Sequence, residues 1–334
     1  MMEREEGIGE MKTEDLRFAA FAGRTPEGAE KLCILEIGEK RILRVYTQTE
    51  GELQNGDIYM GRVEKSSAGI GACFADIGKA EPVFLAEKLT AGTELPLRIK
   101  SPARGGKRAM ACSRIPAELA GLIAEKAAHA AKGSCLYHVP TPLEESLKRC
   151  AGNDRALWIT ADEALYLRAK ALAPEGARLK LHTDRDITLC ALYGLSTKLS
   201  RILSMRVNLP SGEELVIQET EAMVVVDVNS AKAVHGKEKE KTILQLNLEA
   251  AEELAYQIEA RRLSGILMVD FVNMKEKESE TILLSRLKEL SELCEPRYRV
   301  EDITKLGIVE LSRRRTEDSI RAEKDFLNST ILTK

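Results

Sequence analysis

The pattern of apolar and polar positions predicts a strand, a helix and a second strand between residues 223 and 270. Two runs of consecutive apolar residues, 223–226 and 266–269, each end directly before a single acid, Asp227 and Asp270. The segment between them has a charged face and an apolar face at helical spacing, and Gly265 follows it, as expected where a helix ends. The apolar face consists of Ile243, Leu246, Ala250, Leu254 and Ile258.

Asp227 and Asp270 are expected to lie together at one edge of a sheet. Continuous apolar strands joined by a helix are typical of parallel neighbours, which lie about 4.8 Å apart and end at the same edge. Ligands of open α/β sheets bind at this carboxyl edge. A lone Asp after a strand is usually a turn residue. Two adjacent carboxylates, however, repel each other unless one is protonated or a cation bridges them, so the pair favours a Mg²⁺ or Mn²⁺ site.

Short strands separated by glycines predict a small barrel in the first half of the chain. Residues 55–89 are such a set of strands, and residues 93–115 add two more around a basic loop. An Ala-rich helix is expected over residues 116–131, and alternating strands and helices follow it up to residue 200. Residues 1–30 have the composition of a polar, weakly ordered N-terminal extension.

The composition allows two or three ordinary domains and gives no direct indication of a polyanionic partner. The 334 residues are 44% hydrophobic and 31% charged, with a net charge of −3, although a local basic groove would suffice to bind nucleic acid. The seven cysteines are odd in number and include no Cys-x-x-Cys pair, which argues against a complete disulfide framework. No apolar run is long enough to span a membrane, and the N-terminus is too acidic for a signal peptide, so we expect a cytoplasmic protein without a membrane partner.

The segments that carry the two acids resemble the RNase E/G family of endoribonucleases. The stretches "LPSGEELVIQETEAMVVVDVNSAKA", "LNLEAAEELAYQIEARRLSGILMVDFVNM" and "ITKLGIVELSRRR" are similar to its catalytic core, and "GDIYMGRVEKSSAGIGACFADIGKAEPVFL" is similar to its S1-type domain. The resemblance implies a multi-domain α/β fold: an RNase H-like α/β unit (31–54 and 133–203), an inserted S1-type OB β-barrel (55–115), a reduced 5′-sensor remnant (116–132) and a DNase I-like α/β catalytic subdomain (204–334).

The resemblance also implies the chemistry of the acids. Asp227 and Asp270 would hold a catalytic Mg²⁺, with Mn²⁺ as a substitute, and the amide of Asn229 would help to orient the site. An ordinary turn role for Asn229 remains open. The implied activity is cleavage of single-stranded RNA (rRNA precursor, tRNA precursor or mRNA) during processing or decay, leaving 5′-phosphate and 3′-hydroxyl ends.

Five further residues are expected to bind the RNA. By resemblance, Phe74 and Phe84 stack on bases, while Lys107 and Arg297 contact the phosphate backbone. Lys232 and the run "SRRR" at residues 312–315 add positive charge near the motif segments. Burial of Phe74 in the core, and solvated positions for the charged residues, are the alternatives. Position 77, where a second surface aromatic would be expected, is Ile.

Three features of the family pattern are absent or altered. No Arg-Thr pair, the family's 5′-monophosphate reader, occurs between residues 110 and 200, so we expect activity that does not depend on a 5′-phosphate. No Cys-Pro-x-Cys motif follows the catalytic segments, so we expect no structural zinc and a monomer or weak homodimer that is not zinc-linked. Asn273 stands where the family usually has a third acid.

Two other classes of function compete with the endoribonuclease. One is an RNA-binding module of the same fold with weak or no cleavage, which the altered positions favour and the clustered acids oppose. The other is a DNA nuclease or another two-acid phosphotransferase, which shares the metal chemistry but does not explain the S1-like segment.

Overall fold

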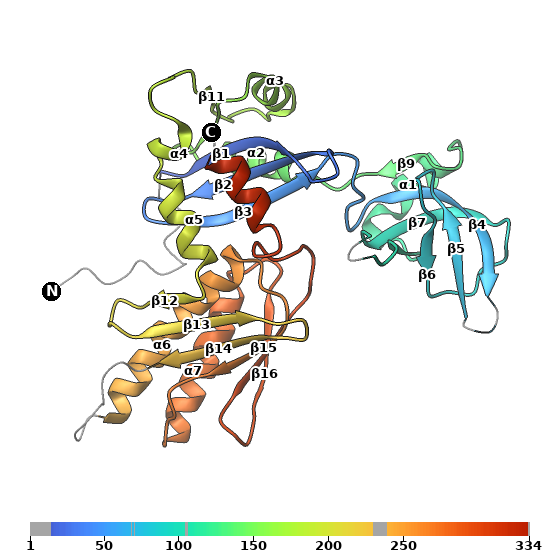
Figure 1. Cartoon of the computed structure of the whole chain (residues 1–334). Coiled ribbons are helices and arrows are strands. Elements are labelled where there is room, and N and C mark those ends of the chain that lie inside the picture. Colours follow the sequence, from blue (N-terminus) through green and yellow to red (C-terminus); the bar gives the residue numbers. More distant parts are fainter. Residues whose placement is uncertain (1–14, 68, 70, 104–105, 230–238, 333–334) are drawn as a thin grey trace. The chain divides into compact units, whose positions relative to one another are not determined.

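A computed structural model describes residues 15–67, 69, 71–103, 106–229 and 239–332 of the chain (Figure 1). They form two compact units. The larger unit contains the described residues of Met1–Gln48 and Pro142–Lys334, and the barrel unit contains those of Thr49–Thr141. The fold is therefore of the mixed α/β, multi-domain class, as the sequence predicts.

The first sheet of the larger unit has the strand order β11-β10-β1-β2-β3 and is covered on both faces. β1 is parallel to β10 and antiparallel to β2. One face packs on α2 and α3, and the other packs on α4, α5 and α8. The bounds are β1 Arg17–Arg24, β2 Glu30–Ile37, β3 Ile42–Thr49, β10 Leu157–Thr160, β11 Leu179–Leu181, α2 Pro142–Ala151, α3 Glu163–Leu172, α4 Leu189–Leu192, α5 Leu195–Leu203 and α8 Lys324–Ile331.

The prediction of a polar extension over residues 1–30 is wrong for β1. This strand is the centre of the first sheet, and Phe18, Ala19, Ala20 and Phe21 are all buried. A central strand covered on both faces is apolar at successive positions and shows no alternation. Its small Ala residues and the acidic sequence before it hid that signal. The first fourteen residues of the predicted extension lie outside the described residues.

The second sheet of the larger unit has the order β12-β13-β14-β15-β17-β16. β14 and β15 are parallel, which confirms the predicted strand, helix and strand, and the five predicted apolar positions of the helix α6 are all buried. α6 and α7 cover the same face of the sheet (Figure 1). The bounds are β12 Arg206–Asn208, β13 Glu214–Glu219, β14 Val224–Asn229, β15 Gly265–Asp270, β16 Tyr298–Ile303, β17 Val309–Arg313, α6 Lys239–Ala260 and α7 Lys277–Ser291.

The chain leaves α6 earlier than the sequence predicts. The helix ends at Ala260, and the residue with a left-handed conformation is Arg262, with φ of 56°. Its guanidinium donates to Glu317 at 2.9 Å and to Thr47 at 2.9 Å, so side-chain contacts hold a conformation that usually selects Gly. Gly265, also at positive φ, begins β15 instead of ending the helix.

The barrel unit contains the predicted small barrel, and its topology is OB-like. β4, β5, β6, β8 and β7 close on themselves through the β4–β5 pairing, and β9 adds to the outside of β4. The predicted Ala-rich helix is present as α1, and its Ile123 packs against Ile58 of β4 and Leu136 of β9. The bounds are β4 Ile58–Ser67, β5 Ala72–Asp76, β6 Val83–Leu85, β7 Glu94–Ser101, β8 Met110–Cys112, β9 Cys135–Tyr137 and α1 Ala120–Ala127, after a short 3₁₀ turn at Ala117–Leu119.

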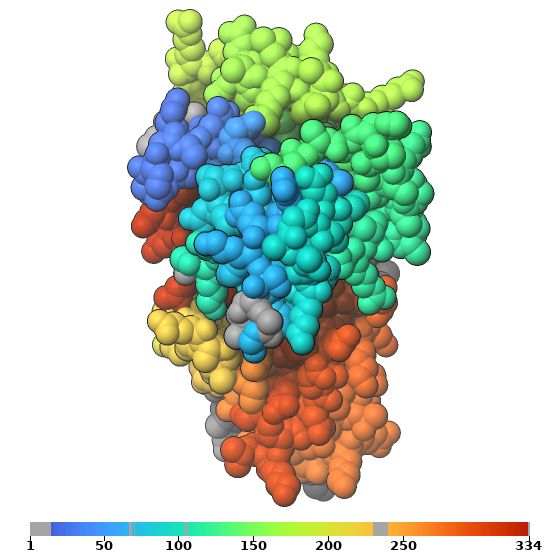
Figure 2. All heavy atoms as spheres, turned by 90° about the vertical axis from the view of Figure 1, so that its right-hand side faces the viewer, coloured from blue at the N-terminus to red at the C-terminus, as the bar shows by residue number. Residues whose placement is uncertain are grey.

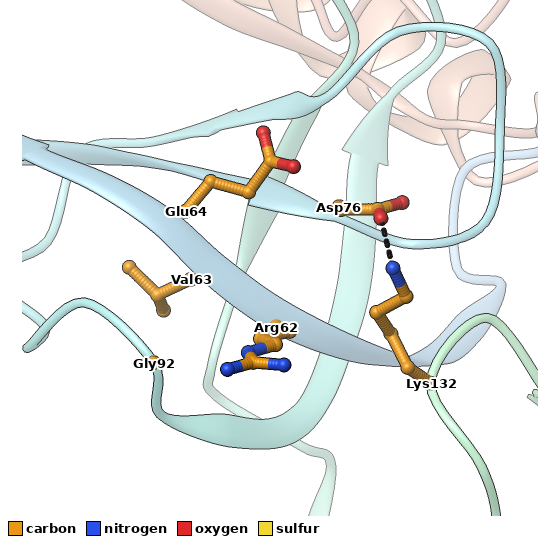
Figure 3. Close-up of a pocket in the computed structure, with 6 residues that line it drawn as sticks. All are labelled: Arg62, Val63, Glu64, Asp76, Gly92 and Lys132. Carbon is orange, nitrogen blue, oxygen red and sulfur yellow. Dashed lines mark hydrogen bonds and ion pairs between the residues drawn. The ribbon is translucent and has the colours of Figure 1, made fainter.

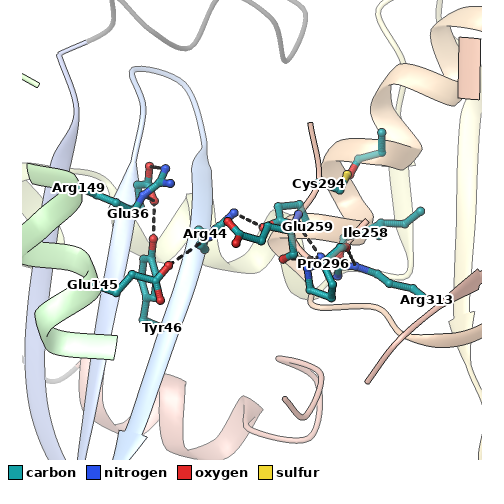
Figure 4. A network of polar contacts seen from close by, with 12 residues as sticks. Glu36, Arg44, Tyr46, Glu145, Arg149, Ile258, Glu259, Cys294, Pro296 and Arg313 are labelled. Atoms are coloured by element: carbon teal, nitrogen blue, oxygen red, sulfur yellow. Dashed lines mark hydrogen bonds and ion pairs between the residues drawn. The ribbon is translucent and has the colours of Figure 1, made fainter. Parts of the chain in front are cut away.

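Within the larger unit, largely buried ion pairs link the two sheets (Figure 4). Glu259 near the end of α6 pairs with Arg44 of β3 on one side and with Arg313 of β17 on the other. Farther along β3, Tyr46 donates to Glu36, which also pairs with Arg149. All seven cysteines are free thiols, and no helix among the described residues is long and apolar enough to cross a membrane.

Candidate functional site

Asp227 and Asp270 lie side by side on the face of the second sheet that α6 and α7 do not cover. Their Cα atoms are direct partners in the parallel pairing of β14 and β15. Strand residues alternate between faces, and the flanking Val226, Val228 and Val269 are buried against the helices. Both carboxylates therefore point away from the helices. Among the described residues, none forms an ion pair or hydrogen bond with either carboxylate.

Apolar side chains share this face with the acids. Val225 and Met268 are paired one step back along the same two strands, and Val216 of β13 is paired with Asp227 on its other side. Val225 is 38% exposed and Ile266 is 50% exposed, so the residues of the two continuous apolar runs alternate between the core and the open face. The two negative charges thus stand on a partly apolar surface, where a compensating cation is favoured more than in bulk water.

Asn229 lies on the same face as Asp227, two residues farther along β14. It is exposed, and its Cα is paired with that of Glu214 on β13. The residues from position 230 to 238 lie outside the described part of the chain, so Lys232 does too. The placement agrees with a role of Asn229 in orienting the site and also with an ordinary turn role, because Asx turns begin at strand ends.

The oxygen donors on this face suit a hard divalent cation. Two carboxylates and one amide oxygen are the ligand types that Mg²⁺ and Mn²⁺ prefer, and Mg²⁺ usually keeps several of its waters. In the described part of the chain, no group of three or more His, Cys, Asp or Glu residues is arranged to hold a metal. The two acids therefore fit a partly hydrated ion rather than a closed structural site.

The helix between the two acidic strands also holds the segment that follows Asp270. Asn247 of α6, which is fully buried, donates to the carbonyl of Val272 at 2.8 Å and accepts from its N–H at 3.0 Å. Glu240, two turns earlier, accepts from the N–H groups of Lys275 and Glu276 at 2.8 and 3.0 Å. These contacts lower the pKa of Glu240, the Glu276 N–H most of all.

Asn247 and Glu249 lie well inside α6 and do not cap its start. The described helix already begins at Lys239. Glu249 accepts from the backbone N–H of Ser211 at 2.9 Å and from its hydroxyl at 3.1 Å, and so holds the hairpin before β13. The sequence contained one sign of the Asn247 contact, a polar residue directly after Leu246 on the buried side of the helix.

On the barrel, Phe74 and Phe84 form one aromatic pair on the outer surface. Their Cα atoms are partners in the β5–β6 pairing, and the ring centroids lie 5.6 Å apart at an interplanar angle of 63°. Cys73, Ala75 and Val83 beside them point into the barrel and are buried, so Phe74 is a surface residue and not a core residue. The guanidinium of Arg108 lies 5.4 Å from the Phe74 ring centre.

The aromatic pair belongs to a longer row across the barrel. Lys65 of β4 is paired with Phe74, and Met110 of β8, 37% exposed, is paired with Phe84. Lys107 is exposed in the connection before β8. The barrel strands, light blue to cyan, make up one continuous area of the surface in Figure 2. Ile77 is fully buried in the barrel core, so position 77 offers no surface for stacking.

A polar pocket of about 300 Å³ lies on the barrel between β4, β5 and the chain before β9 (Figure 3). Arg62 and Glu64 line it from β4, and Asp76 and Lys132 meet across it in an ion pair of 2.5 Å. The hydrogen bond from Lys132, followed by that from the Gly78 N–H, lowers the pKa of Asp76. Because two acids balance the two cations, the pocket is no separate anion site.

The remaining predicted contacts are dispersed over the larger unit. Arg297 is exposed and paired with Glu292 at 2.5 Å, so it is accessible to a phosphate but already has an anionic partner. Within "SRRR", Arg314 and Arg315 are exposed. Arg313, in contrast, is buried, and its guanidinium binds Glu259 and four backbone carbonyls, which makes it a structural residue (Figure 4). The expectation that this whole run adds surface charge is wrong for Arg313.

Comparison with known proteins identifies the family. Residues 117–316, more than half of the chain, match the family model described as "Ribonuclease E/G family". The chain belongs to the ribonuclease E/G family. It is 34% identical over 144 residues to Ribonuclease E of Escherichia coli (strain K12), and 35% identical over 145 residues to the chloroplastic Ribonuclease E/G-like protein of Arabidopsis thaliana.

The similarity to these ribonuclease E/G proteins covers part of each chain. Each of the two alignments spans 43% of this chain and 14% of the relative. A third relative, Ribonuclease G of Haemophilus influenzae, is 35% identical over 129 residues, which is 39% of this chain and 26% of that protein. The matched parts are thus a seventh to a quarter of the relatives' own length.

Proposed function

We propose that this ribonuclease E/G protein is a Mg²⁺-dependent endoribonuclease that cleaves single-stranded RNA in processing or decay. The observation that carries the proposal is the direct pairing of Asp227 with Asp270 on parallel strands, on a face that no described helix covers. Two carboxylates at such a spacing, without an ion-pair partner among the described residues, favour a divalent cation. Membership of the family and the names of the relatives, each a ribonuclease, support RNA as the substrate.

In the proposed mechanism, the side chains on the open face position the reacting groups. Asp227 and Asp270 would hold Mg²⁺, or Mn²⁺ in its place, and Asn229 would orient the Asp227 carboxylate or a phosphate oxygen. The ion, when bound, supplies Lewis-acid charge at the scissile phosphate and lowers the pKa of a coordinated water. Val225 and Met268 lie beside the acids on the same face of the sheet. The expected products carry 5′-phosphate and 3′-hydroxyl ends.

The outer surface of the barrel is the proposed RNA-binding face. Base stacking on Phe74 and Phe84 does not depend on sequence, because every base has a π-face, and Lys107 would contact the backbone. Arg297 is proposed as a phosphate contact, for which it must exchange its exposed partner Glu292. The barrel is proposed to be of the S1 type, the first sheet with its helices an RNase H-like unit, and the second sheet a DNase I-like catalytic subdomain.

Cleavage is proposed to be independent of the 5′ end of the RNA, since no Arg-Thr pair occurs between residues 110 and 200. Equal cleavage rates are expected for substrates that differ only in a 5′-monophosphate, a 5′-triphosphate or a 5′-hydroxyl. A large preference for the monophosphate would contradict this part of the proposal.

The deciding experiment is cleavage of a fluorescent A/U-rich single-stranded RNA in the presence of Mg²⁺. Asp227→Asn and Asp270→Asn are expected to abolish cleavage while RNA binding, measured by anisotropy, is retained. Asp302→Asn, which removes an exposed acid from β16 of the same sheet, serves as the matched control and is expected to cleave like the wild type. A single-stranded DNA of the same sequence tests the DNA nuclease alternative.

Two results would overturn the proposal. Equal cleavage by all four proteins would exclude the Asp227–Asp270 site. Salt-sensitive RNA binding without any cleavage by the wild type would instead favour an RNA-binding module of the same fold, an interpretation that the outward-facing Phe74–Phe84 pair supports.

A further inference from the structure

The contact between Asn247 and Val272 links the site to the helix that connects its two strands. Asn247 is 0% exposed, and its carboxamide uses both its donor and its acceptor on the backbone of one residue, at 2.8 and 3.0 Å. Two hydrogen bonds to the backbone of one residue hold the peptide units on both sides of its Cα, and so fix the orientation of this backbone as well as its distance, which a single bond does not. Val272 follows Asp270 by two positions, directly after β15 ends.

The position of Asp270 requires such a support. Asp270 is the last residue of β15, and its pairing with Asp227 is the last one recorded between these strands. Past this point, from residue 271 to residue 276, the chain has no strand partner before α7 begins. The backbone on one side of Asp270 is therefore held by the sheet, and on the other side by contacts with α6.

α6 is a rigid element on which to fasten this segment. Ala250 and Ala251, one turn beyond Asn247, and Leu254, two turns beyond it, are fully buried in the core under the sheet. Glu240 adds a second attachment seven residues before Asn247, on the same side of the helix, by accepting from Lys275 and Glu276. The two attachments bracket the segment from Val272 to the start of α7.

We propose that Asn247 is a positioning residue, which through Val272 holds the Asp270 carboxylate where a divalent cation shared with Asp227 would bind. Glu240 supports it from the far end of the same segment. This inference rests on the proposed metal site. It adds to that site a residue that would neither bind the metal nor contact the RNA. Groups that orient the ligands of a metal site typically change metal affinity by roughly 10–100-fold when they are removed.

The test measures Mn²⁺ binding directly, from the electron paramagnetic resonance signal of free Mn²⁺ titrated into the protein. Asn247→Asp keeps the size of the side chain but removes the donor to the Val272 carbonyl. We expect its Mn²⁺ dissociation constant to rise at least tenfold over that of the wild type, with RNA binding unchanged. Glu240→Ala is expected to give a smaller increase of a few-fold. Cleavage by both variants is expected to recover at high Mn²⁺.

The matched control is Glu249→Ala. Glu249 also lies on α6 and also accepts a backbone N–H, that of Ser211, but the loop it holds carries no metal ligand. Its dissociation constant for Mn²⁺ is expected to equal that of the wild type. If Asn247→Asp does not fold, as judged by the fluorescence of the buried Trp158, Glu240→Ala decides in its place.

The outcomes separate this inference from the function on which it rests. Wild-type Mn²⁺ affinity in folded Asn247→Asp, or in Glu240→Ala when it is the deciding variant, would overturn the positioning role alone. An equal loss of affinity in Glu249→Ala would also overturn it, because the effect would then be a general response to damage in α6. Wild-type protein that binds no Mn²⁺, or binds it as well after Asp270→Asn, would overturn the metal site and with it the inference.

Discussion

Replacing Arg313 with Met is expected to destabilise the larger unit by about 4 kcal/mol, because breaking a buried ion pair from one side costs roughly 3–5 kcal/mol. The Arg313 guanidinium pairs with Glu259 at 2.5 Å. It also donates to the carbonyls of Pro296, Ile258, Leu263 and Glu295 at 2.8, 3.0, 3.1 and 3.0 Å. Methionine fills similar volume but satisfies none of these acceptors.

The magnitude follows from what the substitution leaves behind. Only one of the five acceptors, Glu259, has a further charged partner, Arg44. The Ile258 carbonyl keeps a second donor, the Leu263 N–H at 3.0 Å. Each of the other carbonyls that stays buried without a donor costs of the order of 1–3 kcal/mol, and relaxation of the loop at residues 295–297 recovers part of that sum. For a unit of this size, about 4 kcal/mol corresponds to a decrease in Tm of roughly 8–16 °C.

The assay is thermal and urea unfolding followed by tryptophan fluorescence. The protein has one Trp, Trp158, which is fully buried in β10 of the larger unit, so the signal reports this unit and not the barrel. Arg314→Met is the matched control, because Arg314 is the next residue in the sequence and is exposed. Its free energy of unfolding is expected to change by no more than about 0.5 kcal/mol. RNA affinity per folded molecule is expected to be unchanged in Arg313→Met.

A loss below about 1 kcal/mol for Arg313→Met, the size typical of an exposed ion pair, would refute the reasoning. It would mean that the carbonyls find water or other donors in the variant. A selective loss of RNA affinity in the folded Arg313→Met protein would instead indicate that Arg313 contacts the RNA.

Three further predictions test other parts of the structure. Phe84→Ala is expected to weaken binding of short single-stranded RNA by roughly 5–150-fold, the equivalent of about 1–3 kcal/mol for a stacked base. An unchanged dissociation constant in anisotropy titrations would show that the aromatic pair does not bind the RNA. Because the pKa of Glu240 is lowered in the folded protein, its carboxylate stabilises the fold above pH 4.5 and loses this effect as the pH falls through the folded-state pKa. The difference in urea midpoint between the wild type and Glu240→Gln should therefore shrink below pH 4.5. A difference that does not depend on pH would contradict the contact. The mass in solution is expected to be that of a monomer or weak dimer and to be unaffected by a chelator, and chelator-sensitive dimerisation would point to a metal-linked interface.

Periodicity predicted the elements that carry the acids because the physics there is local. Strand, helix and strand over residues 223–270 follow from apolar runs and helical spacing, and parallel pairing follows from the connection by a helix. The barrel followed from short strands and glycine turns. β1 was missed because a central strand rich in Ala has neither alternation nor large apolar side chains, and only its position between β10 and β2 accounts for its burial.

The candidate site divides in the same way. The two acids and their common edge were predictable, since strand ends place them irrespective of the rest of the fold. The hydrogen bonds between Asn247 and Val272 join residues 25 positions apart. Arg313 and Ile77 are buried where a surface position was expected, and their burial depends on which side of a strand meets a helix or a barrel interior. Neither is recorded in local spacing.

The amino-acid sequence by itself thus determined the family, the class of fold and the pair of acids, because apolar periodicity and motif residues act within a strand or a helix. Tertiary structure alone decided the direct pairing of Asp227 with Asp270, the outward direction of Phe74 and the burial of Arg313. The physical reason is that register and burial arise from contacts between segments far apart in the chain. Their free energy depends on what each side chain meets after folding and not on its neighbours in sequence.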